Sequence, residues 1–207
     1  GAWANASSSN PERASSEAMI LLKEMVERYY ENSSSNPPPT AATLVTISKV
    51  LCSCPTNHVH SNISKLLKFR NEFRIDSADI ILNNALLTAY ARSARLTSSV
   101  RGNLSVCRNM VDFFDTQIVQ PDRVSFLMSL DALRHCARSI ILNSKEPDHI
   151  AALHDFVMPT SRRLLQHATE AGVADTRMYN DVLGTHAWNV KEAERLFDIH
   201  PKADYMA

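Results

Sequence analysis

A segment near the C-terminal end of the chain constrains the fold most. Residues 176–200, TRMYNDVLGTHAWNVKEAERLFDIH, contain two amphipathic stretches joined by a short turn. Apolar residues at three- and four-residue spacing gather on one side of a helix. Degraded copies of this pattern occur upstream. A recurring helix pair predicts a helical repeat array, because each pair buries its apolar stripe against the next pair.

The same spacing predicts helices along most of the chain. Asn10 followed by Pro11 is a helix-start signal, since Asn caps free amides and Pro fits the first turn. We expect Pro159 to kink or divide one long segment. No alternating run bounded by hairpin turns indicates a strand. The expected helices cover residues 11–31, 41–51, 61–73, 80–92, 104–117, 124–141, 149–171, 176–187 and 190–199.

Three polar segments separate the expected helices. NSSSNPPPT at residues 32–40 contains three consecutive prolines, which exclude a continuous helix. TSSVRGN at residues 97–103 is predicted to be a polar joint that lengthens one helix-pair unit, and NSKEPDH at residues 143–149, with the kinked segment, to enlarge another.

Composition excludes several classes of function. The chain of 207 residues has only 4 Gly, too few for a phosphate-cradling glycine loop or a Rossmann fingerprint. Its 22 Lys+Arg balance 22 Asp+Glu, so attraction to nucleic acid must come from local patches. The 4 Cys lack the spacing of a secreted disulfide framework, and we expect reduced thiols.

No apolar run approaches the roughly 20 residues that span a bilayer. We therefore expect a soluble chain without a membrane partner. It begins with Gly1 and a Ser-rich stretch, which suggests a trimmed or truncated protein.

Five segments resemble the pentatricopeptide repeat family, whose unit is a pair of antiparallel helices of about 35 residues. MYNDVL with EAERLFD resembles the family's first and second helices, and NNALLTAYARSARL resembles another first helix. IVQPDRVSFLMSLDAL resembles the Pro-Asp junction between repeats, and LVTISKVLCSC is a weaker copy. EAMILLKEMVERYY resembles a lone second helix.

This resemblance implies an all-α, right-handed solenoid over residues 11–200, between tails at 1–10 and 201–207. Its insertions and its shortage of Lys-x-Gly turns indicate a short, divergent member. The implied units are 11–36, 44–79, 80–122, 123–175 and 176–200.

The family's base-contacting positions carry over to three residue pairs. In the family, the residue after the first-helix aromatic and the last residue of the repeat contact one base. The pairs are Ser48 with Asp79, implying guanine, Asn84 with Asp122, implying uracil, and Leu127 with Asp175, while Asn180 begins a further repeat. Leu127 has no donor or acceptor for a base edge. Alternatively, Asn84 and Asn180 brace the helix pairs without touching RNA.

Basic residues near two helices are candidates for RNA phosphate contacts. Those we single out are Lys65, Lys68, Arg70, Arg92 and Arg95. The alternative is a solubilising surface that pairs with carboxylates such as Glu72 and Asp76.

Other clusters are less convincing. CSCPTNHVH at residues 52–60 holds two Cys and two His, but their spacing is too compressed for a structural zinc site. His149, His154 and Asp155 match no recognised catalytic spacing. We predict no metal, cofactor or reaction.

By resemblance, we expect an RNA-binding, architectural subunit of an organellar ribonucleoprotein such as the mitochondrial ribosome, with neighbouring proteins as further partners. The expected location is the mitochondrial matrix, or alternatively the chloroplast stroma. The competing hypothesis is a tetratricopeptide-like scaffold that binds proteins without direct RNA contact.

Overall fold

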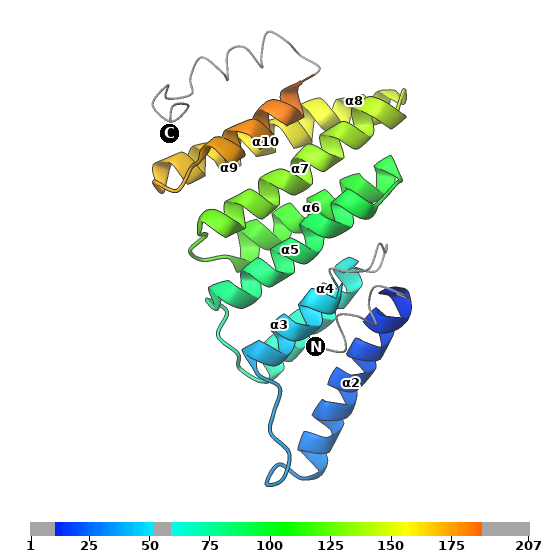
Figure 1. Ribbon diagram of the computed structural model, residues 1–207, viewed down its shortest axis with the longest axis vertical. Helices are drawn as coiled ribbons and strands as arrows, with labels where there is room; N and C mark the ends of the chain where they lie inside the picture. Colours follow the sequence, from blue (N-terminus) through cyan, green and yellow to red (C-terminus); the bar gives the residue numbers. More distant parts are fainter. Residues whose placement is uncertain (1–10, 52–58, 188–207) are drawn as a thin grey trace.

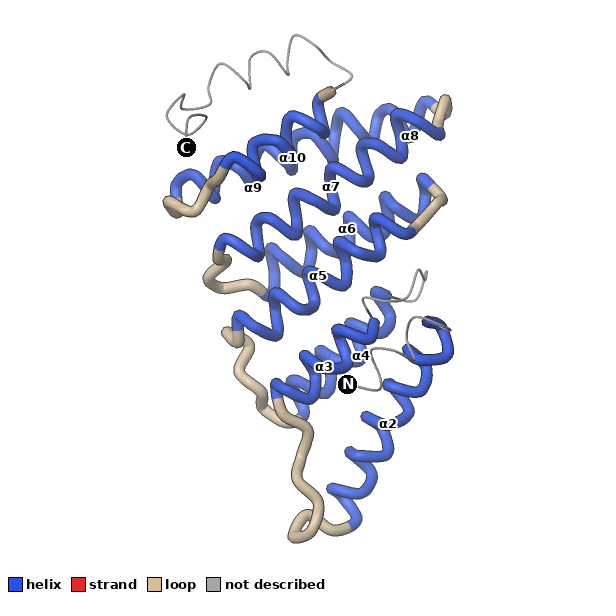
Figure 2. Tube along the Cα trace, in the orientation of Figure 1, coloured by secondary structure: helices blue, strands red, loops and turns tan. Residues whose placement is uncertain are grey.

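A computed structural model describes residues 11–51 and 59–187 of the chain. Within these ranges the protein is all-helical, with no strand (Figure 2). This confirms the predicted all-α class. The predicted helix at 190–199 and both predicted tails lie outside the described residues.

The elements follow the predicted order. Their bounds are α2 Pro11–Glu31, α3 Ala41–Leu51, α4 Val59–Glu72, α5 Ile80–Leu96, α6 Val100–Gln117, α7 Arg123–Asn143, α8 Pro147–Ala152, a π-helical turn η1 Leu153–Val157, α9 Met158–Glu170 and α10 Thr176–His186. None of these helices is long and apolar enough to cross a bilayer.

The helices form two rows along an elongated molecule (Figure 1). In the first row α3 contacts α5, α5 contacts α7, and α7 contacts α10. In the second row α4 contacts α6, and α6 contacts α8. Each first-row helix also packs on a second-row neighbour in sequence, as α5 does on α6. The core therefore runs between the rows as one connected layer that includes Leu86, Tyr90, Phe126 and Leu130.

Three first-row helices begin with the same device. The carboxylates of Asp79, Asp122 and Asp175 accept hydrogen bonds from the third backbone amide of α5, α7 and α10, each at 2.9 Å. Such N-caps satisfy amides that have no partner within the helix. The repeated cap gives α5, α7 and α10 a common reference position along the row.

The polar joint predicted at 97–103 is shorter in the structure. Ser99 caps α6 by accepting from the amide of Gly102 at 3.3 Å, and α6 already begins at Val100. The buried Asn103 donates to the carbonyl of Thr97 at 3.2 Å. These polar side chains make local bonds that start the helix, so Thr97 to Ser99 alone join α5 to α6.

The predicted division at Pro159 is confirmed. Pro159 has no amide hydrogen for the carbonyl four residues earlier. Just before it, the amide of Met158 bonds the carbonyl of Leu153, five residues back, which closes the π-helical turn. Two short helices, α8 and α9, therefore flank this turn.

Candidate nucleic-acid interface

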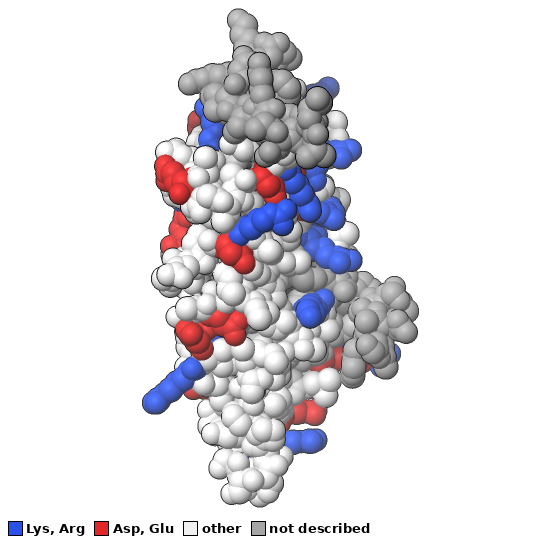
Figure 3. All heavy atoms as spheres, turned by 60° about the vertical axis from the view of Figure 1, so that its left-hand side comes forward, with Lys and Arg blue, Asp and Glu red and all other residues white. Residues whose placement is uncertain are grey.

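Basic residues dominate the first-row helices, although the chain as a whole is neutral. Within α3, α5, α7 and α10 the only acidic residues are Asp131 and Asp181. Their basic residues are Lys49, Arg92, Arg95, Arg123, Arg134, Arg138 and Arg177. Figure 3 shows Lys and Arg side chains gathered along one side of the upper half of the molecule. The charge balance of the sequence thus hides a local cationic excess on this row.

The two carboxylates within the first-row helices, Asp131 and Asp181, are held by two arginines. Arg95 of α5 lies 2.8 Å from Asp131 of α7, and Arg134 of α7 lies 2.9 Å from the other oxygen of Asp131. Arg134 also reaches across to Asp181 of α10 at 2.8 Å. We call this chain of contacts, Arg95–Asp131–Arg134–Asp181, the ion ladder. It ties three consecutive first-row helices together.

Burial affects the two carboxylates of the ion ladder differently. Burial opposes ionisation of Asp131, but hydrogen bonds from Arg134 and Arg95 outweigh it and lower its pKa. Burial raises the pKa of Asp181 to about 6, although Arg134 partly offsets this. Burial also lowers the pKa of His135, which lies 3.6 Å from Asp131. Asp131 is therefore the permanent anion of the ladder, while Asp181 binds a proton more readily than an ordinary carboxyl group.

The arginines around the ion ladder leave cationic charge in solvent. The side chain of Arg95 is 52% exposed and that of Arg134 is 35% exposed, whereas Asp131 is 2% exposed. Arg92 and Arg138 are also exposed, and no carboxylate among the described residues pairs with either. The two anions are buried, whereas Arg92, Arg95 and Arg138 are exposed, which suits contact with phosphate.

The predicted pair of Asn84 and Asp122 lies in direct contact. The side-chain amide of Asn84 donates to both carboxylate oxygens of Asp122, at 3.1 and 3.0 Å. The hydroxyl of Ser125 donates to Asn84 Oδ1 at 2.7 Å. These bonds join α5 to the start of α7. These bonds fit the alternative role of Asn84, in which it braces successive helix pairs.

Burial opposes ionisation of Asp122, but hydrogen bonds from the Ser125 amide and from Asn84 lower its pKa below the usual value. Asp122 therefore remains an acceptor for these donors at neutral pH. Leu127, five residues beyond this cap, is 5% exposed and packs in the core. This unit presents no base-reading side chain at that position.

The base-contact prediction for Ser48 is wrong in this structure. Ser48 is fully buried, and its hydroxyl donates to the carbonyl of Val45 at 2.8 Å. The reason is the position of Ser48 along its helix. Thr40 precedes α3 as Asp79 precedes α5, so Ser48 lies eight residues after Thr40, whereas Asn84 lies five residues after Asp79. The residues eight after Asp79 and Asp122 are Leu87 and Leu130, which are also buried.

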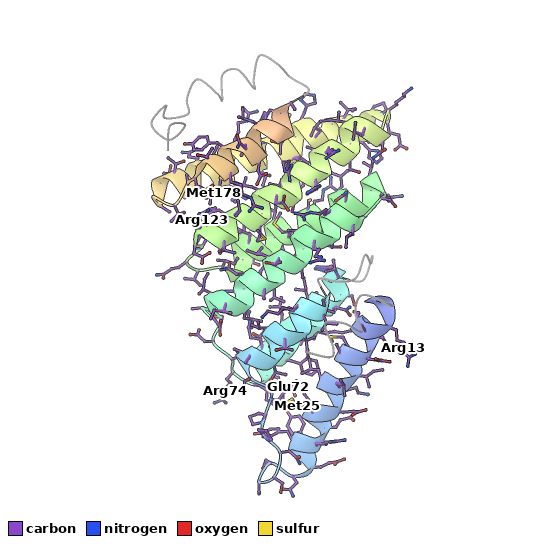
Figure 4. All side chains as sticks on the ribbon, viewed as in Figure 1. Arg13, Met25, Glu72, Arg74, Arg123 and Met178 are labelled. Atoms are coloured by element: carbon purple, nitrogen blue, oxygen red, sulfur yellow. The ribbon has the colours of Figure 1, made fainter. Side chains whose placement is uncertain are left out.

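The remaining base-contact candidates lie on the first row. Asp79 is partly exposed and caps α5 through its bond to the amide of Leu82. Asn180 of α10 is exposed, five residues after Asp175, where Asn84 stands relative to Asp79. At the start of α7, Arg123 donates to Asp175 at 2.7 Å (Figure 4 labels Arg123 and the neighbouring Met178). Asn180 is therefore the candidate best placed to meet a base.

The five phosphate candidates do not form one surface. Lys65 and Lys68 are exposed on α4 in the second row, whereas Arg92 and Arg95 lie on α5 in the first row. The prediction for Arg70 is wrong, because Arg70 is 2% exposed and donates to Gln117 at 2.6 Å. Burial lowers its pKa. Its position on the α4 face toward α6 removes it from any phosphate at the surface.

The other clusters considered in the sequence analysis are only partly described by the structure. Residues 52–58 of the Cys-His loop lie outside the described residues, and His60 contacts the hydroxyl of Tyr90 at 2.9 Å. No group of three metal-ligating side chains occurs among the described residues. Cys107 and Cys136 are free and buried, and the pKa of Cys107 is raised by its hydrogen bond with Cys136 and by burial.

Sequence reasoning missed Arg134, Asp131 and Asp181. One signal was available: Asp131 interrupts the apolar stretch SFLMSLDALRHCA, where a buried charge requires a partner. Arg134 follows Asp131 by three residues on α7, a spacing that could have identified it, whereas Arg95 lies on α5 and could not be identified from spacing.

No protein-family model, curated protein or solved structure matches this chain in the comparisons made.

Proposed function

We propose that this chain is a non-enzymatic RNA-binding and architectural protein that grips RNA with its first-row helices. The observation that carries the proposal is the cationic excess within the helices of this row, whose two internal carboxylates, Asp131 and Asp181, are buried and paired in the ion ladder. Outward-facing guanidinium groups bind phosphate by charge and by paired hydrogen bonds.

The stacking of the two helix rows supports a right-handed solenoid of helix pairs as the finer description of the fold. Successive contacts between α3, α5, α7 and α10, with repeated aspartate caps, are what such an array requires. In this proposal RNA follows the first row, and the loops between helix pairs contact neighbouring proteins. The proposed setting, by resemblance to pentatricopeptide repeats, is an organellar ribonucleoprotein such as the mitochondrial ribosome in the mitochondrial matrix.

Sequence selectivity is a minor part of the proposal. Ser48 and Leu127 are buried, and Asn84 is engaged by Asp122 and Ser125, which leaves Asn180 as the open amide. One correct base contact contributes about 1–3 kcal/mol of discrimination, by analogy with DNA readers. Phosphate contacts therefore supply most of the proposed affinity.

The test is retention of the whole chain on uridine-rich RNA across a salt series. We expect Arg92→Ala and Arg138→Ala each to weaken binding and to reduce the slope of log K against log salt by about 0.7. Lys68→Ala on the second row is the matched control and should leave the slope unchanged. Asn180→Ala should lower the preference for uridine-rich over adenine-rich RNA without changing the slope.

Three outcomes separate the alternatives. Absence of binding at low salt would refute RNA binding and leave the protein-scaffold hypothesis. An equal effect of Lys68→Ala and Arg92→Ala on RNA binding would show that the interface is not confined to the first row. Unchanged base preference in Asn180→Ala would show that phosphate contacts act alone.

A further inference from the structure

A groove between α2 and α4 combines an apolar floor with a basic rim. Its volume is about 740 Å³. The floor includes Met19, Ile20 and Phe69, and the rim includes Lys23, Lys65 and Lys68. Ile20 is 52% exposed, so part of the apolar lining of the groove is open to solvent.

The groove interrupts the packing of the second row. There α4 packs on α6 and α6 on α8, whereas α2 packs on α3 and leaves the groove beside α4. Two polar bridges close its ends: Asn62 donates to Ser15 at 3.4 Å, and Tyr30 donates to Glu72 at 2.5 Å. The stretch of α4 from Asn62 to Glu72 spans about 15 Å, which defines the groove's length.

Two of the three rim lysines have no carboxylate close by among the described residues. Lys65 and Lys68 have no carboxylate partner among the described residues, and Lys23 lies 3.4 Å from Glu27 on its own helix. Glu72 is the only acidic residue lining the groove, and it accepts the Tyr30 hydroxyl (Figure 4 labels Glu72 at the end of α4). An occupant that complements this rim carries negative charge on both sides of an apolar strip.

The walls of the groove favour a helical occupant. Both walls are helices whose backbone groups bond internally, so they offer no backbone partners to an extended chain. A helix satisfies its own backbone and presents apolar residues at three- and four-residue spacing. The groove opens to solvent along its length, which accommodates the polar outer face of such a helix.

We propose that the α2–α4 groove docks an acidic amphipathic helix of about ten residues from a partner protein. The apolar stripe of that helix lies on Met19, Ile20 and Phe69, and its acidic residues meet the three lysines. Methionine suits this role, because its flexible thioether adapts to different side chains. This inference is independent of RNA binding by the first row, which uses other residues.

The test uses fluorescence anisotropy with a fluorescein-labelled helical peptide of about 14 residues, with leucines at helical spacing flanked by glutamates. The whole chain should bind it saturably, with a Kd of about 10–100 µM that rises with salt. The double variant Lys65→Glu/Lys68→Glu should bind at least about tenfold more weakly, as expected for loss of about 1.4 kcal/mol. A peptide with lysine in place of glutamate should not bind.

The matched control is Lys49→Glu/Arg92→Glu, which makes the same charge change on the first row and should leave peptide binding intact. Circular dichroism of both double variants verifies that they fold. Lack of saturable peptide binding, or equal loss in both double variants, overturns the proposal. The proposal also fails if Lys65→Glu/Lys68→Glu abolishes binding of uridine-rich RNA that competes with the peptide, because the groove is then a nucleic-acid site.

Discussion

Asn84 on α5 donates hydrogen bonds to both carboxylate oxygens of Asp122, the residue that caps α7. Ser125 donates to the carbonyl oxygen of the same Asn84 side chain. A base that approaches Asn84 must compete with these bonds. The contact therefore acts first as a joint between successive helix pairs, and its loss should lower the free energy of unfolding.

Replacing Asn84 by Ala should destabilise the protein by about 1–3 kcal/mol, because it removes bonds to a charged, partly buried carboxylate. Asn180→Ala, at the equivalent exposed position of α10, should change stability by less than about 0.5 kcal/mol. Urea denaturation of both variants measures the difference. Equal stability of the two variants would argue against a bracing role for Asn84.

Replacing Arg134 by Met should lower the free energy of unfolding by about 2–3 kcal/mol. This is less than the loss expected for a fully buried ion pair, because the Arg134 side chain is 35% exposed. Its loss leaves Asp181 without its arginine, while Asp131 keeps Arg95. Arg138→Met, one turn further along α7, is the matched control and should have little effect. Asp181→Asn should recover part of the loss in the Arg134→Met background. Equal losses of unfolding free energy in Arg134→Met and Arg138→Met would contradict a structural role for the ion ladder.

Asp181 should make stability depend on pH. Burial raises its pKa from 3.8 to about 6, so the folded state holds the proton more tightly than the unfolded chain. Stability contributed by this group is therefore lost as pH rises from about 4 to 6, by roughly 2–3 kcal/mol. Asp181→Asn removes that dependence, so its stability relative to the parent should increase between pH 4.5 and 7.5. A pH-independent difference in urea denaturation would contradict this assignment.

Two helix ends differ in the residue that adopts a left-handed conformation. Gly172 follows α9 with φ 68°, and Arg74, which is labelled in Figure 4, follows α4 with φ 53°. Arg74→Gly should stabilise the protein by about 0.5–1 kcal/mol, because only Gly adopts this conformation without strain. Gly172→Ala should destabilise it by about 1 kcal/mol through the backbone alone, since an added Cβ meets no atom within 4 Å. Thermal denaturation should give opposite signs for the two variants. The same sign in both would contradict this explanation.

Local signals in the sequence predicted most of the helical structure. The periodicity and the Asn10-Pro11 start place the first helix at 11–31, where α2 lies, and the predicted helix at 41–51 matches α3. Pro159 was identified as a break because its missing amide acts within one turn. The difference at residues 97–103 came from treating Ser99 as part of a turn, when it caps α6.

The candidate interface was less predictable. The family resemblance paired Asn84 with Asp122 as contacts to one base, but their mutual hydrogen bonds depend on how α5 and α7 stack. Arg70 had the pattern of a surface cation, yet packing beside α6 buries it against Gln117. A side chain's exposure is set by which helix packs against its face, and composition does not contain that information.

The sequence by itself determined that this chain forms helices, where most of them begin and end, and that each has an apolar side. Those properties depend on residues within one or two turns of each other. Only the tertiary structure decided that Ser48 is buried, that Arg134 joins Asp131 to Asp181, and that α2 leaves a basic groove beside α4. Each of these depends on contacts between helices far apart in the chain, and such contacts are fixed by the packing of whole helix faces.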